Sequence, residues 1–299
     1  MTTPNLLGGV TNGLRRALLW PAFEEHFLKT GDGTRLFLRI ARTFSAPRGV
    51  VVITHGLGEH SGRYAHVAAA LLEKGLTVVG WDLRGHGRSS GPRGDIAEYG
   101  VLLADLALVC AHYRMTGRPL FLYAHSMGAQ VALRFLEEAH PNCAGAVIAS
   151  PWLRLAFDPP WWKLALAWIA LRVRPGFIQQ TGTRLERLSR DLRHLESLPG
   201  LELVHHNISA RMYFAVRAAG EQALQEAGKL RVPLLLLHGD DDPITSHHAT
   251  RELFDRAGVA DKTLQILPQS RHETHNDLDR DLVIRAIGDW IAARMPSES

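Results

Sequence analysis

The sequence is poor in cysteine and lacks a long apolar run. Its 299 residues include two cysteines, Cys110 and Cys143, whose spacing is not that of a disulfide framework. We expect two reduced, buried thiols in a cytoplasmic protein, with one disulfide as the alternative. No window reaches the ~20 apolar residues of a membrane span. The nearest, residues 161–171, has about half that length, which argues against a helical membrane protein.

Concentrated charge is also missing. The formal net charge is only +4, and the basic residues are scattered along the chain. With no basic stripe, zinc-finger spacing or RNA-binding signature, nucleic acid is not an expected partner. The first 23 residues make a poor signal peptide because Arg15 and Arg16 interrupt their short apolar stretches. We expect a loosely packed leader there, with a weak amphipathic membrane contact as the alternative.

What is present is a regular alternation of strand and helix patterns. Two runs around Gly31–Gly33 indicate an antiparallel hairpin. In the second run Leu36, Leu38 and Ile40 alternate with Arg35, Phe37 and Arg39, the period of a half-buried strand. Apolar strands and helical patterns then alternate, with one long helix expected over about 95–115. This order predicts an α/β fold class, with a mostly parallel central sheet that follows the antiparallel hairpin and is covered by helices on both faces.

The alternation stops after Ser150 and resumes at Val232. The residues between have helical patterns and no clear strand. We therefore predict a core made of residues 1–150 and 232–299, and an inserted helical cap, or lid, over residues 151–231.

The most informative stretch is Ala-His-Ser-Met-Gly, residues 124–128, at a predicted strand-to-helix turn. It is a variant of the G-x-S-x-G nucleophile elbow, in which small neighbours let a strained serine stand above the sheet. Ala124 departs from the usual first glycine but is still small, and Gly128 fits the pattern. Ser126 is thus the candidate nucleophile; the alternative is a serine that merely caps a helix.

A serine nucleophile needs a base and an acid, in the order serine, acid, histidine along this fold. Asp240, Asp241 and Asp242 follow a late strand, and we choose Asp242, expecting the other two to serve the turn or face solvent. His272 follows the last strand and is our candidate base; His275 is expected to form local bonds. A metal role for this pair is weak without further ligands.

Two glycine-containing loops accompany these residues. The loop 55–60 follows the first central strand, and we expect the backbone amides of Leu57 and Met127 to form an oxyanion hole. The alternatives are an ordinary turn or a metal loop. The loop 82–94 resembles a dinucleotide motif only superficially, because it opens no helix in a βαβ unit. We expect Asp82 and His86 to have structural roles.

Taken together, "HGLGEHSGRY", "DLRGHGRSSGPRG", "AHSMG", "ASPWL", "LLLLHGDDDPIT" and "SRHETHND" resemble monoacylglycerol lipases and bacterial lysophospholipase-like serine hydrolases of the α/β-hydrolase fold. The resemblance covers about residues 23–296 and is weakest in the lid. It implies Ser126, Asp242 and His272 as the triad, Leu57 and Met127 as oxyanion donors, and Glu59 and Arg63 near the polar end of the substrate. The extra acidic residue in "HGDDDP" departs from the simplest family pattern.

The predicted lid is rich in tryptophan, with Trp152, Trp161, Trp162 and Trp168. Eight Lys or Arg and four Asp or Glu lie between Pro151 and Gly200. An apolar surface flanked by cations suits a helix at a lipid interface, so we expect peripheral membrane or micelle contact through the lid. Packing of these tryptophans on the core or on a second copy is the alternative. Trp152 is also a candidate substrate contact.

The sequence therefore predicts a serine ester hydrolase that cleaves monoacylglycerols through an acyl-enzyme, with no metal or organic cofactor. A lysophospholipase or general carboxylesterase would use the same chemistry. A carbon–carbon or amide hydrolase, and a non-catalytic ligand binder, stay open as rivals. Dehalogenase and epoxide hydrolase chemistry is disfavoured because the elbow carries no carboxylate.

Overall fold

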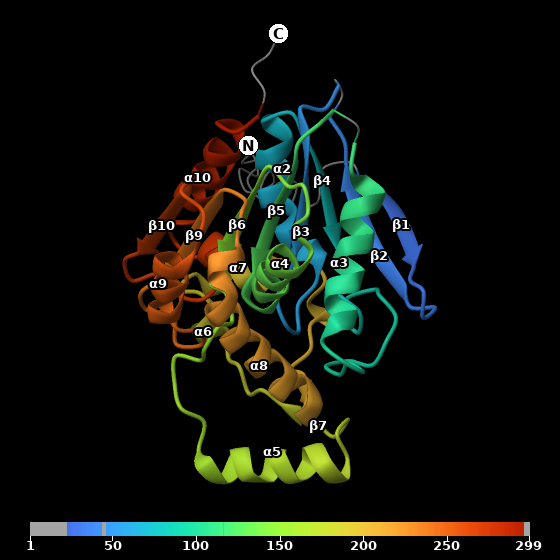
Figure 1. The fold of residues 1–299 in the computed structure, drawn as a ribbon, viewed down its shortest axis with the longest axis vertical. Helices are drawn as coiled ribbons and strands as arrows, with labels where there is room; N and C mark the ends of the chain where they lie inside the picture. Colours follow the sequence, from blue (N-terminus) through green and yellow to red (C-terminus); the bar gives the residue numbers. More distant parts are fainter. Residues whose placement is uncertain (1–22, 44–45, 116, 296–299) are drawn as a thin grey trace, which may run out of the picture.

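A computed structural model describes residues 23–43, 46–115 and 117–295; the leader expected before residue 23 lies outside them. The described chain forms one eight-stranded sheet in the order β1-β2-β4-β3-β5-β6-β9-β10 (Figure 1). The bounds are β1 Phe23–Lys29, β2 Arg35–Ala41, β3 Gly49–Thr54, β4 Leu76–Trp81, β5 Leu120–His125, β6 Gly145–Ala149, β9 Leu234–Gly239 and β10 Lys262–Leu267.

The sheet is parallel from β4 to β10 and antiparallel at its beginning, as the sequence predicts. Strands β3 to β6 and β9 are buried throughout, which explains their unbroken apolar runs. Strand β2 differs from the expected alternation, because Phe37 is fully buried. Its ring packs under the Arg88 guanidinium, 4.0 Å from the centroid, and beside Phe27.

Helices cover both faces of the sheet (Figure 1). One apolar cluster joins the sheet to α2 (Ala65–Glu73) and α10 (Arg280–Ala292). The other joins it to α3 (Gly100–Tyr113), α4 (Ser126–Ala139), α8 (Ala210–Glu226) and α9 (His247–Arg256). Helix α3 begins later than predicted. Asp95 instead accepts hydrogen bonds from Ser209 and Arg211, so the chain before α3 is held as a loop.

Residues 151–231, called here the β6–β9 connection, hold α8 and the α-helices not yet named. They contain α5 (Trp161–Val173), α6 (Leu185–Leu188), α7 (Leu192–Ser197) and α8. The expectation of no strand is wrong, because β7 (Ile178–Gln180) pairs with β8 (Asn207–Ser209) in a small antiparallel sheet. Strands of three residues are too short to show an alternating pattern.

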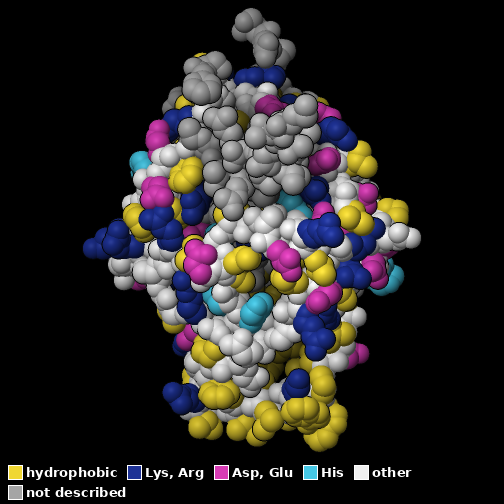
Figure 2. Space-filling model, turned by 180° about the vertical axis from the view of Figure 1, so that it is seen from behind, with side chains coloured by type: hydrophobic (Ala, Val, Ile, Leu, Met, Phe, Trp, Pro, Cys, Tyr) yellow, Lys and Arg dark blue, Asp and Glu magenta, His cyan; other side chains and the backbone are white. Residues whose placement is uncertain are grey.

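Helix α5 stands apart from the rest of the molecule at one end (Figure 1). None of its residues is buried. Its apolar side chains include Trp161, which is 80% exposed, and Trp162 and Trp168, each about half exposed. Figure 2 shows hydrophobic side chains gathered over this end.

Among the residues that the structure describes, no helix is both long and apolar enough to cross a membrane.

Candidate active site

Ser126 occupies the sharp turn between β5 and α4. Its φ of +54° lies in the left-handed region, which is costly for a residue with a side chain. The turn is possible because its neighbours are small: a Cβ on Gly128 would lie 2.2 Å from the backbone oxygen of His55 on the adjacent strand's end. Ala124, buried beside Thr54 of β3, has room for its methyl group. The strained turn therefore holds the Ser126 hydroxyl at the start of α4.

Three side chains distant in sequence meet at this turn. The Ser126 Oγ lies 3.0 Å from Nε2 of His272, and His272 Nδ1 lies 2.7 Å from Oδ2 of Asp242. They follow the carboxyl ends of β5, β9 and β10, which lie at the same edge of the parallel sheet, with β6 between β5 and β9. All three are buried, Ser126 being 7% exposed. The arrangement is a serine–histidine–carboxylate hydrogen-bonded chain.

The Asp242 carboxylate is fully engaged. Its Oδ1 accepts backbone hydrogen bonds from Ile244 and Thr245, and its Oδ2 accepts one from the Thr245 hydroxyl at 2.8 Å besides that from His272. Burial favours the neutral acid, but the nearby His272 and the donated hydrogen bonds outweigh burial. The pKa of Asp242 is therefore held well below its ordinary range, and the group stays ionised.

The pKa of His272 is shifted in the opposite direction to that of Asp242. Burial lowers the pKa of its imidazole, but the charge of Asp242 and the hydrogen bond to it outweigh burial, so the pKa ends above its ordinary value. With Nδ1 donating to Asp242, Nε2 is free to accept a proton from Ser126. This is the tautomer that a general base beside a hydroxyl requires.

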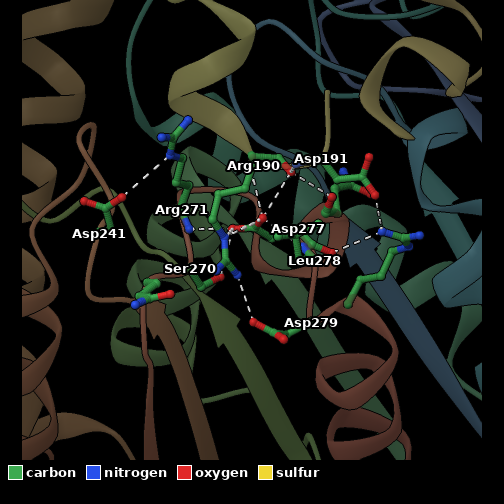
Figure 3. A network of polar contacts seen from close by, with 12 residues as sticks. Arg190, Asp191, Asp241, Ser270, Arg271, Asp277, Leu278 and Asp279 are labelled. Carbon is green, nitrogen blue, oxygen red and sulfur yellow. Dashed lines mark hydrogen bonds and ion pairs between the residues drawn. The ribbon is translucent and has the colours of Figure 1, made fainter. Parts of the chain in front are cut away.

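A buried carboxylate, Asp277, holds the loop that carries His272 (Figure 3). It accepts hydrogen bonds from the backbone N–H of Arg271 at 2.7 Å and of Arg190 at 2.9 Å, and it pairs with the Arg190 guanidinium. The Ser150 hydroxyl donates to the His272 carbonyl from the other side at 2.8 Å. The position of the imidazole is thus fixed by its own backbone and by a residue of the β6–β9 connection.

The predicted oxyanion donors lie on two sides of Ser126. Met127 is the second residue of α4, and the loop after β3 brings Gly56 and Leu57 to the cavity that Ser126 also lines. A Cβ on Gly56 would lie 3.0 Å from Ser126 Cβ, so this loop packs closely on the elbow. The amides at the start of a helix have no partner within the helix and carry partial positive charge, which suits a developing oxyanion.

The other candidate loops have structural contacts. Asp82 accepts hydrogen bonds from the Ser61 backbone and hydroxyl and from the Arg88 backbone, which ties its loop to the one after β3. His86 is buried beside His55. Within the described parts of the chain, no group of three or more His, Cys, Asp or Glu is placed to hold a metal ion.

The neighbours of the candidate triad also take distinct places. Asp240 accepts from the Gln269 backbone in a turn, and Asp241 is exposed beside Arg271. His275 is fully buried and stacks on Tyr64, with ring centroids 4.8 Å apart. These positions agree with turn, solvent and local roles.

A buried ionic cluster stands beside the elbow. The Arg63 guanidinium lies 3.3 Å from a Glu59 oxygen and 2.7 Å from a Glu273 oxygen, and Glu59 also accepts from the Gly56 N–H at 2.6 Å. Burial and the nearby Glu273 charge raise the pKa of Glu59 to about 7, although Arg63 acts to lower it. All three side chains line the same cavity as Ser126 and give it a polar end.

The whole cavity has a volume of about 640 Å³, and away from this polar end its wall is mostly apolar. Trp152, Leu155, Ile208 and Tyr213 line it near the core, and Phe157, Trp162, Leu164 and Leu166 line it from α5 and the chain before it. Trp152 is buried, and its backbone N–H donates to the Ser126 carbonyl at 3.1 Å, so it differs from the exposed tryptophans of α5. A volume of this size suits a small-molecule ligand.

The part of the β6–β9 connection from α6 onward is bonded to the loop after β3 and to the loop after β10. The His205 N–H donates to the Gly58 carbonyl at 2.8 Å, and the Glu273 N–H donates to the Leu188 carbonyl at 2.8 Å. A Cβ on Gly58 would lie 2.2 Å from the His205 oxygen, and its φ is +81°. This contact needs glycine.

Sequence reasoning missed several of these residues. Asp277, Ser150, Thr245 and His238, which contacts Asp242, are ordinary residues in sequence, and only the fold brings them together. The available signal was their place just after strand ends, where catalytic loops gather.

Comparison with known proteins now adds to this geometry. The model of the family described as "Serine aminopeptidase, S33" matches residues 45–279. The chain belongs to this family of serine hydrolases.

Individual relatives agree. The monoacylglycerol lipase of Mycolicibacterium smegmatis is 30% identical over 91% of this chain and 98% of its own. The crystal structure of Paleococcus ferrophilus monoacylglycerol lipase superposes with a TM-score of 0.78 at 32% identity, covering 86% of this chain and 99% of that one. An uncharacterised abhydrolase domain-containing protein of Dictyostelium discoideum is 33% identical over 90% of this chain, which spans 29% of that protein's length. The chain is a serine ester hydrolase of the α/β-hydrolase fold.

Proposed function

We propose that this serine hydrolase cleaves monoacylglycerols into a fatty acid and glycerol, with Ser126, His272 and Asp242 as its catalytic triad. The observation that carries the proposal is the continuous chain of hydrogen bonds from Ser126 through His272 to Asp242, opening into a cavity that is apolar along most of its wall and ionic at one end. Relatives named as monoacylglycerol lipases cover nearly the whole chain, which supports the same substrate class.

In the first half of the reaction, Ser126 Oγ attacks the ester carbonyl as His272 Nε2 takes its proton. The carbonyl oxygen becomes an oxyanion, which the backbone N–H groups of Leu57 and Met127 stabilise. The tetrahedral intermediate collapses and the bond to the glycerol oxygen breaks. His272 gives its proton to that oxygen, and glycerol leaves while the acyl group stays on Ser126.

In the second half, a water molecule takes the place of glycerol. His272 removes a proton from the water, whose oxygen attacks the acyl carbonyl. Collapse of the second intermediate breaks the bond to Ser126 Oγ, which regains the proton from His272, and the fatty acid is released. Asp242 stays ionised throughout and stabilises the imidazolium in both halves.

The two ends of the cavity suit the two ends of a monoacylglycerol. The Glu59–Arg63–Glu273 cluster supplies acceptors and donors for hydroxyl groups. The family resemblance of Glu59 and Arg63 supports this polar end. The apolar wall, including Trp152, would take the acyl chain. A lysophospholipid would bring a phosphate beside two carboxylates, which is less favourable.

Residues 151–231 would act as a lid on a core of residues 1–150 and 232–299. Its exposed tryptophans on α5 lie beside Lys163 and Arg172, with the Arg172 guanidinium 3.4 Å from the Trp168 ring centroid. An apolar helix with cations at its edge can lie at a lipid surface. We propose that α5 contacts the membrane or micelle from which the substrate enters, in an otherwise cytoplasmic protein.

Substrate class is tested by assaying wild type and Ser126→Ala on monoacylglycerols, lysophospholipids, p-nitrophenyl esters and aminoacyl p-nitroanilides. Monoacylglycerols should give the highest kcat/KM, and Ser126→Ala should lose at least about 10³-fold on every ester. A preference for the anilides would favour the peptidase chemistry in the family's description. Full activity of Ser126→Ala, or no fluorophosphonate labelling of Ser126 in the folded protein, would rule out the triad.

The lid is tested with Trp161→Ser combined with Trp162→Ser. Activity on micellar substrate and binding to anionic vesicles should fall. Activity on short soluble esters should be kept, because Trp161 is exposed and Trp162 lines only the α5 wall of the cavity, which a short acyl group does not need. Leu282→Ser on α10, an equally exposed apolar side chain away from α5, is the matched control. Equal losses on soluble and micellar substrates would contradict the proposed lipid contact.

A further inference from the structure

A second imidazole, besides that of His272, is hydrogen-bonded to the Asp242 carboxylate. His238, on β9, is fully buried, and its Nε2 lies 3.0 Å from Oδ2 of Asp242. This is the same oxygen that His272 Nδ1 approaches at 2.7 Å. One carboxylate oxygen is therefore shared by two histidines, of which only His272 reaches Ser126.

The contacts of His238 fix its tautomer. Its Nε2 faces two acceptors, the Asp242 carboxylate and the Thr245 carbonyl at 3.2 Å, so Nε2 must carry a hydrogen. Its Nδ1 lies 2.7 Å from the Thr250 hydroxyl, which can donate to it. Both ring nitrogens thus have a partner, and His238 donates a hydrogen bond to Asp242 through Nε2.

We propose that His238 is a positioning residue that shares the Asp242 carboxylate with His272 and limits how strongly that carboxylate holds the catalytic imidazolium. The proposal rests on the proposed triad. A hydrogen bond donated to the carboxylate draws its negative charge toward His238 and leaves less for His272. The base consequently loses its proton at a lower pH than it would beside an unshared carboxylate, and it is ready to accept one from Ser126 nearer neutral pH.

Other ionisable groups surround the two rings and would be unchanged by a substitution at His238. Those facing His272 are Asp242, Glu273, Glu59 and His125. Those facing His238 are Asp242, His125 and His247, the last with ring centroids 6.3 Å apart. Because none of these is altered, a change in the titration of His272 would report the lost hydrogen bond.

Two amide substitutions distinguish a hydrogen bond donated to Asp242 from the mere presence of a polar side chain at position 238. In His238→Gln the amide nitrogen can reach the place of Nε2 and still donate to Asp242. In His238→Asn the shorter amide reaches only the place of Nδ1, toward Thr250. We would measure kcat/KM for a p-nitrophenyl ester from pH 5 to 9, together with Tm, with His238→Leu as a second variant that lacks the donor.

The acidic limb of the pH profile should move up by roughly half to one pH unit in His238→Asn and His238→Leu, and should stay near the wild-type position in His238→Gln. The NMR resonance of the His272–Asp242 proton should move in the first two variants only. The proposal would be overturned if the acidic limb stayed in place in a folded His238→Asn or His238→Leu variant. It would also be overturned if His238→Gln shifted the limb as far as those variants do. Full activity of Ser126→Ala would instead refute the triad itself, so the two failures are distinguishable.

Discussion

Asp242→Asn should inactivate the enzyme by moving the ring hydrogen of His272 from Nδ1 to Nε2. The asparagine carbonyl oxygen would keep the two backbone hydrogen bonds from Ile244 and Thr245, because a backbone N–H can only donate. The groups at the other oxygen can adapt, since the Thr245 hydroxyl can rotate and the His238 ring can change tautomer. The amide NH₂ would then stand where Oδ2 was, 2.7 Å from His272 Nδ1. That nitrogen would have to accept, which moves the ring hydrogen to Nε2, where it points at Ser126. The base could no longer take the serine proton.

The expected loss in kcat is about 10³- to 10⁴-fold, or roughly 4–5.5 kcal/mol of transition-state stabilisation. A water-soluble p-nitrophenyl ester is the substrate of choice because it avoids the lipid interface, and Tm would show that the variant is folded. Asp241→Asn is the matched control: this neighbouring carboxylate is exposed and 3.6 Å from Arg271. If Asp242→Asn kept more than a tenth of wild-type kcat, the assignment of Asp242 as the triad acid would be wrong.

Three further predictions concern stability. Asp277→Asn would turn an NH₂ toward its donors and should cost about 2–4 kcal/mol of unfolding free energy in urea, as well as activity. Gly128→Ala should prevent folding or lower Tm steeply, because its Cβ would lie 2.2 Å from the His55 oxygen. Glu59 has a folded pKa raised to about 7 from 4.5, so its ionisation opposes folding; from pH 4.5 to 8 the wild type should lose up to roughly 3 kcal/mol relative to Glu59→Gln. Parallel pH curves for these two proteins would contradict this environment for Glu59.

The architecture could be predicted because its cause is local. Continuous apolar strands such as β3 and β5 must be covered on both faces, and strands that alternate with helices must run parallel. Once the strands are parallel, the residues after their carboxyl ends share one edge of the sheet. The proximity of Ser126, Asp242 and His272 follows from that edge, without knowledge of any contact.

The contacts that support these residues could not be predicted in the same way. His238 reads as part of a buried strand, and its approach to Asp242 depends on how the following turn folds back. Asp277 lies just before α10, a position typical of a helix start, yet its carboxylate is used by Arg190 and Arg271. Phe37 was expected on the exposed side of its strand, and Arg88, from the loop after β4, covers its ring. In each case the deciding partner is distant in sequence.

Two backbone hydrogen bonds, from the His205 N–H to Gly58 and from the Glu273 N–H to Leu188, divide the β6–β9 connection into two parts. These two parts have different freedom to change in sequence. The part from α6 onward bonds directly to the loops that carry Gly58 and Glu273. Helix α5 has no buried residue, and the chain that follows it bonds to β8 and α8 instead of to those loops. New substrate ranges can therefore arise by exchanging roughly the α5 stretch alone. A chimera that replaces only this stretch with a foreign sequence should keep its esterase activity. A chimera that replaces all of residues 151–231 would also lose the hydrogen bonds made by His205 and Leu188.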